Sequence, residues 1–207
     1  MTGNFIVFEG LTASGKKTQI HLLNEWFTNQ NKKVVKISFP SYGNQIGDMI
    51  KTWTRKNFAV DNKTMAMLFA ADRSQMESQI KKWLEDDWVV LCDRYSYSNI
   101  AYQSAKGLDK NWLIDLERET IKPDLVFYLD LSDEDASKRY NIQLGLDKFI
   151  EMKRSRPQPA LSNKIREEYI SISENPPYGE KIHTIDGTKT IMQIHNDICK
   201  IIENEIV

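Results

Sequence analysis

Short apolar runs that alternate with helix-like segments constrain the fold of this chain more than any other feature. The runs are rich in β-branched and aromatic residues, which is typical of strands covered on both faces. They occupy residues 5–9, 33–38, 88–92 and 124–130, with a weaker run at 181–185. This alternation predicts a doubly wound, three-layer α/β fold in which a five-stranded parallel sheet is flanked by helices. Sheets of this kind bind ligands beside the carboxyl ends of their strands.

The segments between the runs carry apolar residues at helical spacing. We expect one long helix over about 63–86 and a last helix that begins after residue 190. Ser132, three residues before Asp135, is expected to cap a helix whose first turn is acidic, and Thr190 is expected to cap the last helix.

Composition excludes several classes of protein. The 207 residues carry a formal net charge of −1, so no bulk basic surface argues for a nucleic-acid partner. The two cysteines, Cys92 and Cys199, are too few for a disulfide framework and are expected to be buried thiols of a reducing compartment. No apolar run is long enough to span a bilayer, and no secretory leader is recognisable. We therefore expect one domain over 1–207, cytoplasmic and without a membrane partner.

A glycine-bounded segment, Gly10–Lys16, follows the first apolar run and opens a helix. Its G-x-x-x-x-G-K pattern in this context predicts a P-loop, whose backbone N–H groups cradle phosphates. Lys16 would bind the β- and γ-phosphates of ATP. An ordinary strand–helix turn is the alternative. The residues expected to bind phosphate here are Gly10, Ser14, Gly15, Lys16, Lys17 and Thr18.

One position of the P-loop departs from the usual pattern. Lys17 stands where a Ser or Thr hydroxyl commonly binds Mg²⁺, and Thr18 lies about 100° further round the helix. We therefore expect Mg²⁺ to be held mainly by ATP phosphates, water and one distant carboxylate.

An acid and a guanidinium follow the third run directly, as Asp93 and Arg94. Asp93 would help to bind Mg²⁺, through water, and Arg94 would span donor and acceptor phosphates. With Lys16 they form the expected catalytic set. A structural ion pair between Asp93 and Arg94 is the alternative.

The polar segment 141–163 interrupts the strand–helix rhythm. It carries four cations, Lys148, Lys153, Arg154 and Arg156, and two prolines. It is either a solvated surface segment or a mobile lid that closes over nucleotide phosphates.

Several motifs together resemble those of the thymidylate kinase family. They are Phe8–Gly10 with Gly15–Gln19, Phe39–Gly43, Leu68–Arg73, Asp93–Gln103, Lys122–Leu125, Leu146–Phe149 and Lys164–Tyr169. The resemblance runs from about residue 5 to the last helix. It implies the P-loop nucleoside-monophosphate kinase fold, transfer of phosphate from ATP to dTMP with Mg²⁺, and a homodimer.

The resemblance also implies roles for single residues. On the acceptor side, Phe69 would stack on thymine, Arg73 would donate to a thymine carbonyl, and Asn99 would add a polar contact. Tyr102 would lie against the sugar, and Arg94 would bind the acceptor phosphate. The remaining implied site residues are the pocket walls Phe39 and Tyr42, the adenine-side Arg139 with the turn 186–188, and the lid cations Lys148, Arg154 and Arg156.

Other interpretations remain open at this stage. Phe69 and Tyr102 could be core aromatics, and Arg73 could be a surface residue paired with Glu77. Thr12 stands where the family usually has Asp, which with Lys17 raises the alternative of a nucleotide-binding regulatory protein with degraded catalysis. A deoxynucleoside kinase acting on thymidine, with Glu9 as base, is the other alternative.

Overall fold

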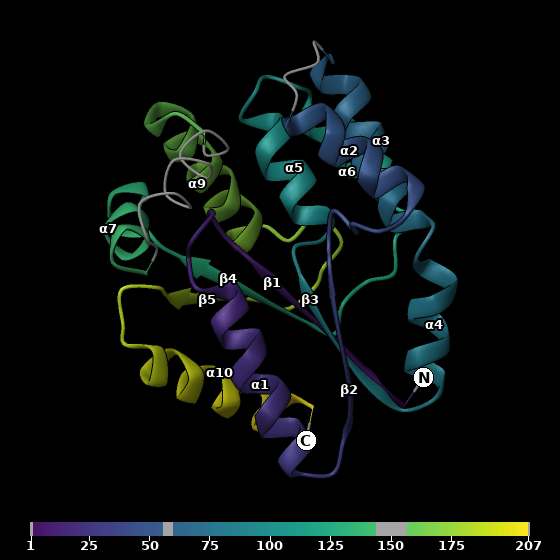
Figure 1. Ribbon diagram of the computed structural model, residues 1–207, viewed down its shortest axis with the longest axis vertical. Coiled ribbons are helices and arrows are strands. Elements are labelled where there is room, and N and C mark those ends of the chain that lie inside the picture. Colours follow the sequence, from purple (N-terminus) through teal and green to yellow (C-terminus); the bar gives the residue numbers. More distant parts are fainter. Residues whose placement is uncertain (1, 56–59, 144–156, 207) are drawn as a thin grey trace.

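A single parallel sheet organises the chain, in a computed structural model that describes residues 2–55, 60–143 and 157–206. Its strands are β1 (Asn4–Glu9), β2 (Lys33–Ser38), β3 (Trp88–Asp93), β4 (Leu125–Asp130) and β5 (Ile182–Asp186), in the order β2-β3-β1-β4-β5. All four pairings are parallel. The predicted three-layer α/β fold with a five-stranded parallel sheet is confirmed (Figure 1).

The order of the strands places a switch point at the carboxyl end of β1. The chain leaves β1 towards β2 on one side, and later crosses to β4 on the other side. Phe8 of β1 is in register with Asp93 of β3, so the loops that follow these two strands start side by side. A ligand site is expected at this edge of the sheet.

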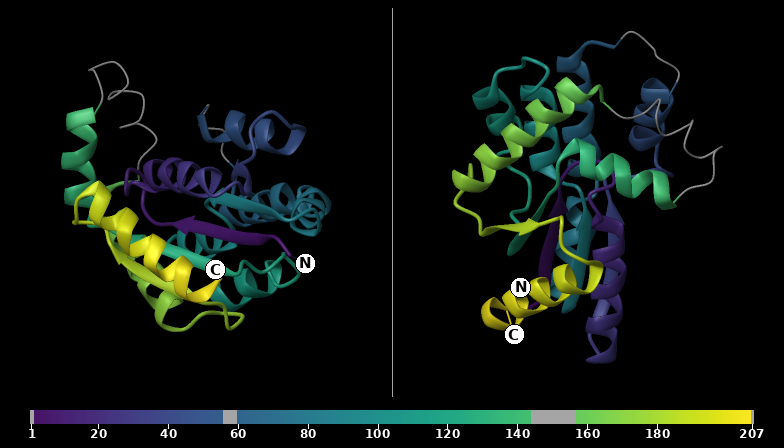
Figure 2. Two further views of the ribbon diagram at one scale, coloured as in Figure 1. Left: turned by 90° about the horizontal axis from the view of Figure 1, so that it is seen from below. Right: turned by 90° about the vertical axis from the view of Figure 1, so that its left-hand side faces the viewer.

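Helices cover both faces of the sheet (Figure 2). They are α1 (Lys16–Asn29), α2 (Gln45–Arg55), α3 (Asn62–Ser74), α4 (Glu77–Glu85), α5 (Ser96–Ser104), α6 (Lys110–Leu116), α7 (Asp133–Gln143), α9 (Pro159–Glu174) and α10 (Ile191–Glu205). Side chains of β1 alternate between the two cores. Phe5 and Val7 pack with α3–α6 and α9, whereas Ile6 and Phe8 pack with α1 and α10.

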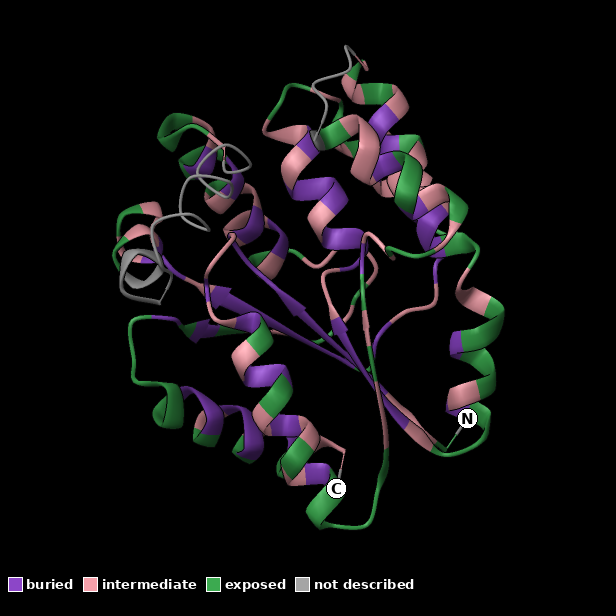
Figure 3. Ribbon diagram, in the orientation of Figure 1, coloured by how far each residue is buried: buried purple, intermediate pink, exposed green. Residues whose placement is uncertain are grey.

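Burial differs between the centre and the edge of the sheet (Figure 3). β1 and β4 are buried along almost their whole length, while β2 is half-buried or exposed throughout. β2 pairs only with β3, so one of its edges and part of one face remain accessible.

The single helix expected over 63–86 is wrong, because the structure divides it into α3 and α4 at Gln75 and Met76. The Gln75 amide donates to Asp72 Oδ1 at 2.8 Å and to Asn44 Oδ1 at 3.0 Å, which ties the end of α3 to the segment after β2. The break lets Ile80 of α4 turn into the core.

The two expected helix caps are confirmed. Ser132 Oγ accepts from Asp135 N at 3.0 Å, and Thr190 Oγ1 accepts from Gln193 N at 3.3 Å within a capping box. Cys92 and Cys199 are buried free thiols, as expected. In the described ranges no helix combines the length and apolarity needed to cross a membrane.

We expect Ile198→Ala to lower the free energy of unfolding by about 2–5 kcal/mol, since the side chain is fully buried between α10 and the sheet and its truncation leaves a cavity. Urea unfolding measures the change. Ile191→Ala in the same helix is the matched control and should cost less than about 0.5 kcal/mol, because Ile191 is 47% exposed. Equal losses in both variants would contradict the packing of α10.

Candidate active site

The Gly10–Lys16 segment forms a tight loop between β1 and α1. Gly10 has φ +138°, and a Cβ there would lie 2.6 Å from the carbonyl oxygen of Leu129. Gly15 has φ +104° and is the N-cap residue of α1, without a side-chain cap bond in the described structure. The N–H groups of the first turn are therefore available to an anion, and the helix dipole favours one there.

Lys16 is folded into the loop and is only 5% exposed. Its Nζ donates to Leu11 O at 2.9 Å and to Gly10 O at 3.1 Å, and it lies 3.4 Å from Ser14 Oγ. Burial, reinforced by the nearby charge of Arg94, lowers the pKa of Lys16 to about 7. A phosphate at the loop would supply the negative charge that this ammonium lacks.

Arg94 lies between the P-loop and the helices that follow β3. Its backbone has φ +71°, a left-handed conformation that costs a non-glycine residue about 1–2 kcal/mol. The guanidinium donates to Ser98 Oγ at 3.1 Å and is 3.5 Å from both Thr12 Oγ1 and Tyr169 Oη. It also lies over the Tyr102 ring, with Cζ 5.2 Å from the ring centroid.

The positive charge of Arg94 is stabilised by groups near it, although no carboxylate of the described residues contacts the guanidinium directly. Burial alone would lower the pKa of Arg94, but Tyr102, Tyr169 and the carboxylates of Asp93 and Glu9 raise it above its usual value. Between these described residues, no ion pair within 4.0 Å links Arg94 to Asp93. The structural ion pair considered as an alternative does not form.

Glu9 is buried and bonded through both of its carboxylate oxygens. Oε1 accepts from Tyr95 N at 2.8 Å and Ser98 N at 3.1 Å, and Oε2 accepts from Ser98 Oγ at 2.6 Å and Tyr169 Oη at 2.8 Å. Burial raises the pKa of Glu9, while the charge of Arg94 and the hydrogen bonds from Ser98 Oγ, Tyr95 N and Tyr169 Oη oppose that rise. This carboxylate caps α5, and its two oxygens already accept four hydrogen bonds from the protein.

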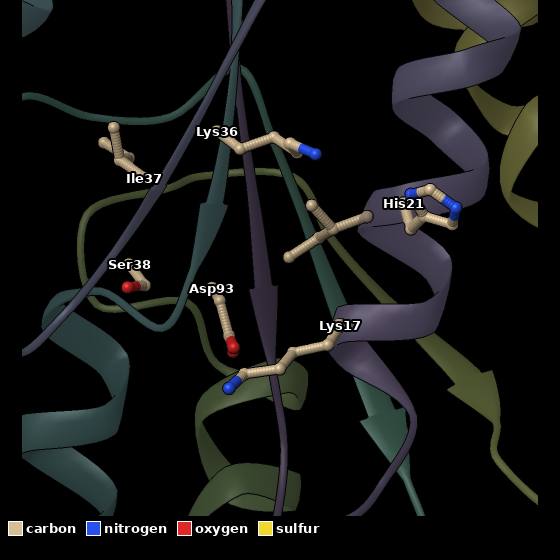
Figure 4. A pocket seen from close by; sticks show the side chains of 7 residues that line it. Lys17, His21, Lys36, Ile37, Ser38 and Asp93 are labelled. Carbon is tan, nitrogen blue, oxygen red and sulfur yellow. The ribbon is translucent and has the colours of Figure 1, made fainter.

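Asp93 lies beside a cavity of ≈ 240 Å³ between α1, β2 and β3 (Figure 4). Its Oδ1 is buried and accepts no hydrogen bond from the described residues. The Lys17 ammonium reaches towards the same space, and Lys17 is exposed. Mg²⁺ commonly uses one carboxylate together with phosphates and water, so Asp93 fits that role, whereas Lys17 offers the metal no ligand. Thr18 is half-buried on α1.

The acceptor-side residues Arg73 and Asn99 meet at a buried acid, Glu117. Arg73 is 2% exposed, and its Nε donates to Glu117 Oε2 at 3.0 Å while its Nη2 donates to Glu117 Oε1. Asn99 Nδ2 donates to the same Oε1 at 2.6 Å. The alternative pairing of Arg73 with Glu77 is wrong, because α3 ends at Ser74 and Glu77 begins the next helix.

Other acceptor-side aromatics occupy different environments. Tyr102 is half-buried, and its hydroxyl is buried without a partner in the described structure, which is common where a ligand completes a site. Phe69 is half-buried on α3. Phe39 belongs to the core, with its ring 5.7 Å from that of Tyr95, whereas Tyr42 is 57% exposed and lies under Lys51 Nζ.

The loop after β2, which carries Phe39 and Tyr42, is anchored by a residue of the Leu68–Arg73 motif to which the sequence analysis gave no role. The fully buried Asp72 of α3 accepts from Ser41 N at 2.7 Å. Tyr169 ends the Lys164–Tyr169 motif but was likewise given no role, and Glu117 belongs to none of the quoted motifs. Each is an ordinary helical residue in the sequence, and only the fold brings it to the site.

Several predicted residues cannot be placed. Lys148, Arg154 and Arg156 lie outside the described residues, and Arg139 is in α7 but its side chain is not described. In the turn after β5, Asp186 Oδ1 accepts from Thr188 N at 2.9 Å and from Thr188 Oγ1 at 2.6 Å.

Comparison with known proteins gives one consistent result. A family model described as thymidylate kinase matches residues 8–198. The probable thymidylate kinase of Thermococcus gammatolerans is 36% identical over 99% of this chain and 98% of its own length. The thymidylate kinase of Plasmodium falciparum is also 36% identical, over 96% of this chain and 89% of its own length.

A solved structure of thymidylate kinase from Candida albicans superimposes with a TM-score of 0.80 at 28% identity, covering 98% of this chain and 92% of that one. The family match spans the P-loop, Arg94 and the Arg73–Glu117–Asn99 cluster. This chain therefore belongs to the thymidylate kinase family of ATP-dependent phosphotransferases.

Proposed function

We propose that this chain transfers the γ-phosphoryl group of ATP to dTMP, giving dTDP and ADP. The observation that carries the proposal is the position of Arg94. Its guanidinium lies between Thr12 of the P-loop and Tyr102 of α5, so one cation can contact both the donor and the acceptor phosphates. Family membership supports the same donor and acceptor.

The transfer is a direct in-line displacement in which an acceptor phosphate oxygen attacks the γ-phosphorus. That phosphate is already anionic, so no general base is needed and catalysis is positioning plus charge neutralisation. Lys16 and Arg94 supply positive charge, together with cations of the lid 141–163, among them Lys148, Arg154 and Arg156. Lid closure excludes water that would otherwise hydrolyse ATP.

Mg²⁺ is part of the proposal, with Asp93 as its protein contact through water. Bound Mg²⁺ would neutralise negative charge on the ATP phosphates. The Oδ1 of Asp93, at the end of β3, is buried and has no hydrogen-bond partner among the described residues, which supports this assignment.

On the acceptor side, Phe69 stacks on the thymine ring and Arg73 donates to a thymine carbonyl oxygen. Asn99 adds a second polar contact to the base, and Tyr102 disfavours a ribose 2′-hydroxyl. Phe39 and Tyr42 contribute to the pocket wall. On the donor side, Arg139 and the turn 186–188 lie near adenine.

The proposal extends to a single domain over 1–207, a homodimer and a cytoplasmic location. The free thiols of Cys92 and Cys199 fit a reducing compartment. No observation favours thymidine as the acceptor, since Glu9 is committed to capping α5.

A coupled ADP-release assay with ATP and Mg²⁺ tests the function. We expect dTMP to give the highest kcat/KM among dTMP, dUMP, dCMP, dGMP and thymidine. A higher kcat/KM for another monophosphate would leave the phosphate chemistry intact and refute the base assignment. ATP binding without turnover of any acceptor would instead favour a regulatory nucleotide-binding protein.

We expect Arg94→Ala to lower kcat by at least about 10²–10³-fold, because the removed cation contacts charge that develops during transfer. Steady-state kinetics with dTMP measure the loss, and circular dichroism checks that the fold survives. Arg118→Ala is the matched control, since Arg118 is an exposed cation paired with Asp115. Near-normal turnover in Arg94→Ala would exclude this role.

We expect ADP binding at pH 8 to take up close to one proton at Lys16. The Lys16 pKa is about 7 in the free protein, so the amine is mostly neutral at pH 8, and phosphate oxygens raise that pKa. By linkage, ADP affinity should then fall as the pH rises above about 7.

Titration calorimetry in two buffers of different ionisation enthalpy measures this proton uptake. Lys16→Met should abolish it. Lys17→Ala should retain it, because Lys17 is an exposed neighbour. A binding enthalpy that is independent of the buffer would refute the proton uptake.

A further inference from the structure

The buried carboxylate of Glu117, at the end of α6, connects the two polar side chains proposed to contact the base. Glu117 is fully buried and comes from a different helix than either of its partners. It accepts from Arg73 through both oxygens and from Asn99 through Oε1. An ionised carboxylate accepts hydrogen bonds and donates none, so each partner must turn a donor group towards it.

Asn99 has a single amide orientation as a result. Its Nδ2 donates to Glu117 Oε1 at 2.6 Å and to the carbonyl oxygen of Ala66 at 3.0 Å. Both partners are acceptors, so an exchange of the amide nitrogen and oxygen would bring oxygen against oxygen. The other amide atom, Oδ1, is buried and has no hydrogen-bond partner in the described structure. It remains as an unused acceptor.

Arg73 is held in the same manner. Two of its three guanidinium nitrogens, Nε and Nη2, donate to Glu117. The third, Nη1, makes no hydrogen bond to the described residues and remains as an available donor. The cluster therefore leaves the N–H groups of Arg73 Nη1 as oriented donors and Asn99 Oδ1 as one fixed acceptor.

We propose that Glu117 is a positioning residue that sets the base specificity of the acceptor site, by orienting the Arg73 guanidinium so that Nη1 is left to donate and by fixing Asn99 Oδ1 as an acceptor. This inference rests on the proposed function. Thymine and uracil offer a carbonyl oxygen at position 4 and an N–H at position 3, which complement this pair. Cytosine offers an amine and a bare ring nitrogen at the same positions, so both contacts become repulsive.

Glu117→Gln is the direct test, since it keeps the shape and replaces one acceptor with a donor. The new N–H₂ opposes a donor of Arg73 in either orientation, Nε at the Oε2 position or Nη2 at the Oε1 position. At the Oε1 position it also opposes Asn99 Nδ2, which favours an Asn99 amide that is turned over. We expect kcat/KM for dTMP relative to dCMP to fall by at least about tenfold, mainly through a higher KM for dTMP. The ratio of kcat/KM for dTMP to that for dUMP should stay unchanged, because thymine and uracil carry the same groups at ring positions 3 and 4.

A purely structural role for Glu117 predicts a different pattern. A buried arginine without its carboxylate would loosen the pocket and lower kcat/KM for dTMP, dUMP and dCMP alike. Equal losses, or an unchanged ratio of dTMP to dCMP, would overturn the inference.

Two further variants keep the test decisive. Asp115→Asn makes the same acid-to-amide change on the same helix, but its Arg118 partner is exposed, so all ratios should stay at the wild-type values. Glu117→Asp retains the charge beside Arg73 while shortening its reach, and it replaces Glu117→Gln in the assay if that variant fails to fold. A smaller fall in the dTMP to dCMP ratio is expected for it, and no fall would overturn the inference.

The wild-type protein separates the two hypotheses. If it does not prefer dTMP over dCMP, the proposed function fails and the inference fails with it. If it does prefer dTMP and Glu117→Gln keeps that preference, only the role of Glu117 is refuted.

Discussion

The rest of the active site depends on the hydrogen bonds that the buried Glu9 carboxylate accepts. Glu9 ends β1, caps α5 through two backbone N–H groups, and accepts from the Tyr169 hydroxyl of α9. The sheet, α5 and α9 are thereby fixed to one point beside the P-loop. A buried charge with four donors is stable there, whereas a buried charge without them would be costly.

Among the described residues, no carboxylate is a direct partner of the cations that surround this point. Lys16 is bonded to loop carbonyl oxygens, and Arg94 lies against hydroxyl groups and an aromatic ring. These neutral contacts hold the side chains in place without cancelling their charge. Burial, together with the nearby charge of Arg94, lowers the pKa of Lys16, although Asp93 and Glu9 partly oppose this shift. Under the proposed function, nucleotide phosphates supply the negative charge that balances these two cations.

The sequence predicts those parts of the molecule in which neighbouring residues carry the signal. Continuous apolar runs predict the strands, and the glycine pattern places Lys16 at a helix N-terminus. The break between α3 and α4 escapes this kind of reasoning, because its cause is a contact between Gln75 and the segment after β2. Glu117 escapes it too, since its partners Arg73 and Asn99 belong to other helices. The alternative pairing of Arg73 with Glu77 relies on the spacing of one continuous helix. In the structure α3 ends at Ser74, before Glu77.

Thr12 stands where the family pattern has aspartate, and in the structure it lies beside Arg94. The Thr12 hydroxyl lies 3.5 Å from the Arg94 guanidinium, and the aspartate that the family pattern leads one to expect there would stand within ion-pair reach of it. A hydroxyl forms a weaker contact and leaves the positive charge of Arg94 uncompensated. Under the proposed function, this charge is available to the phosphates of both substrates. Threonine in place of aspartate therefore weakens one contact of the Arg94 guanidinium. It does not displace the side chain, because Ser98 and Tyr102 still orient it.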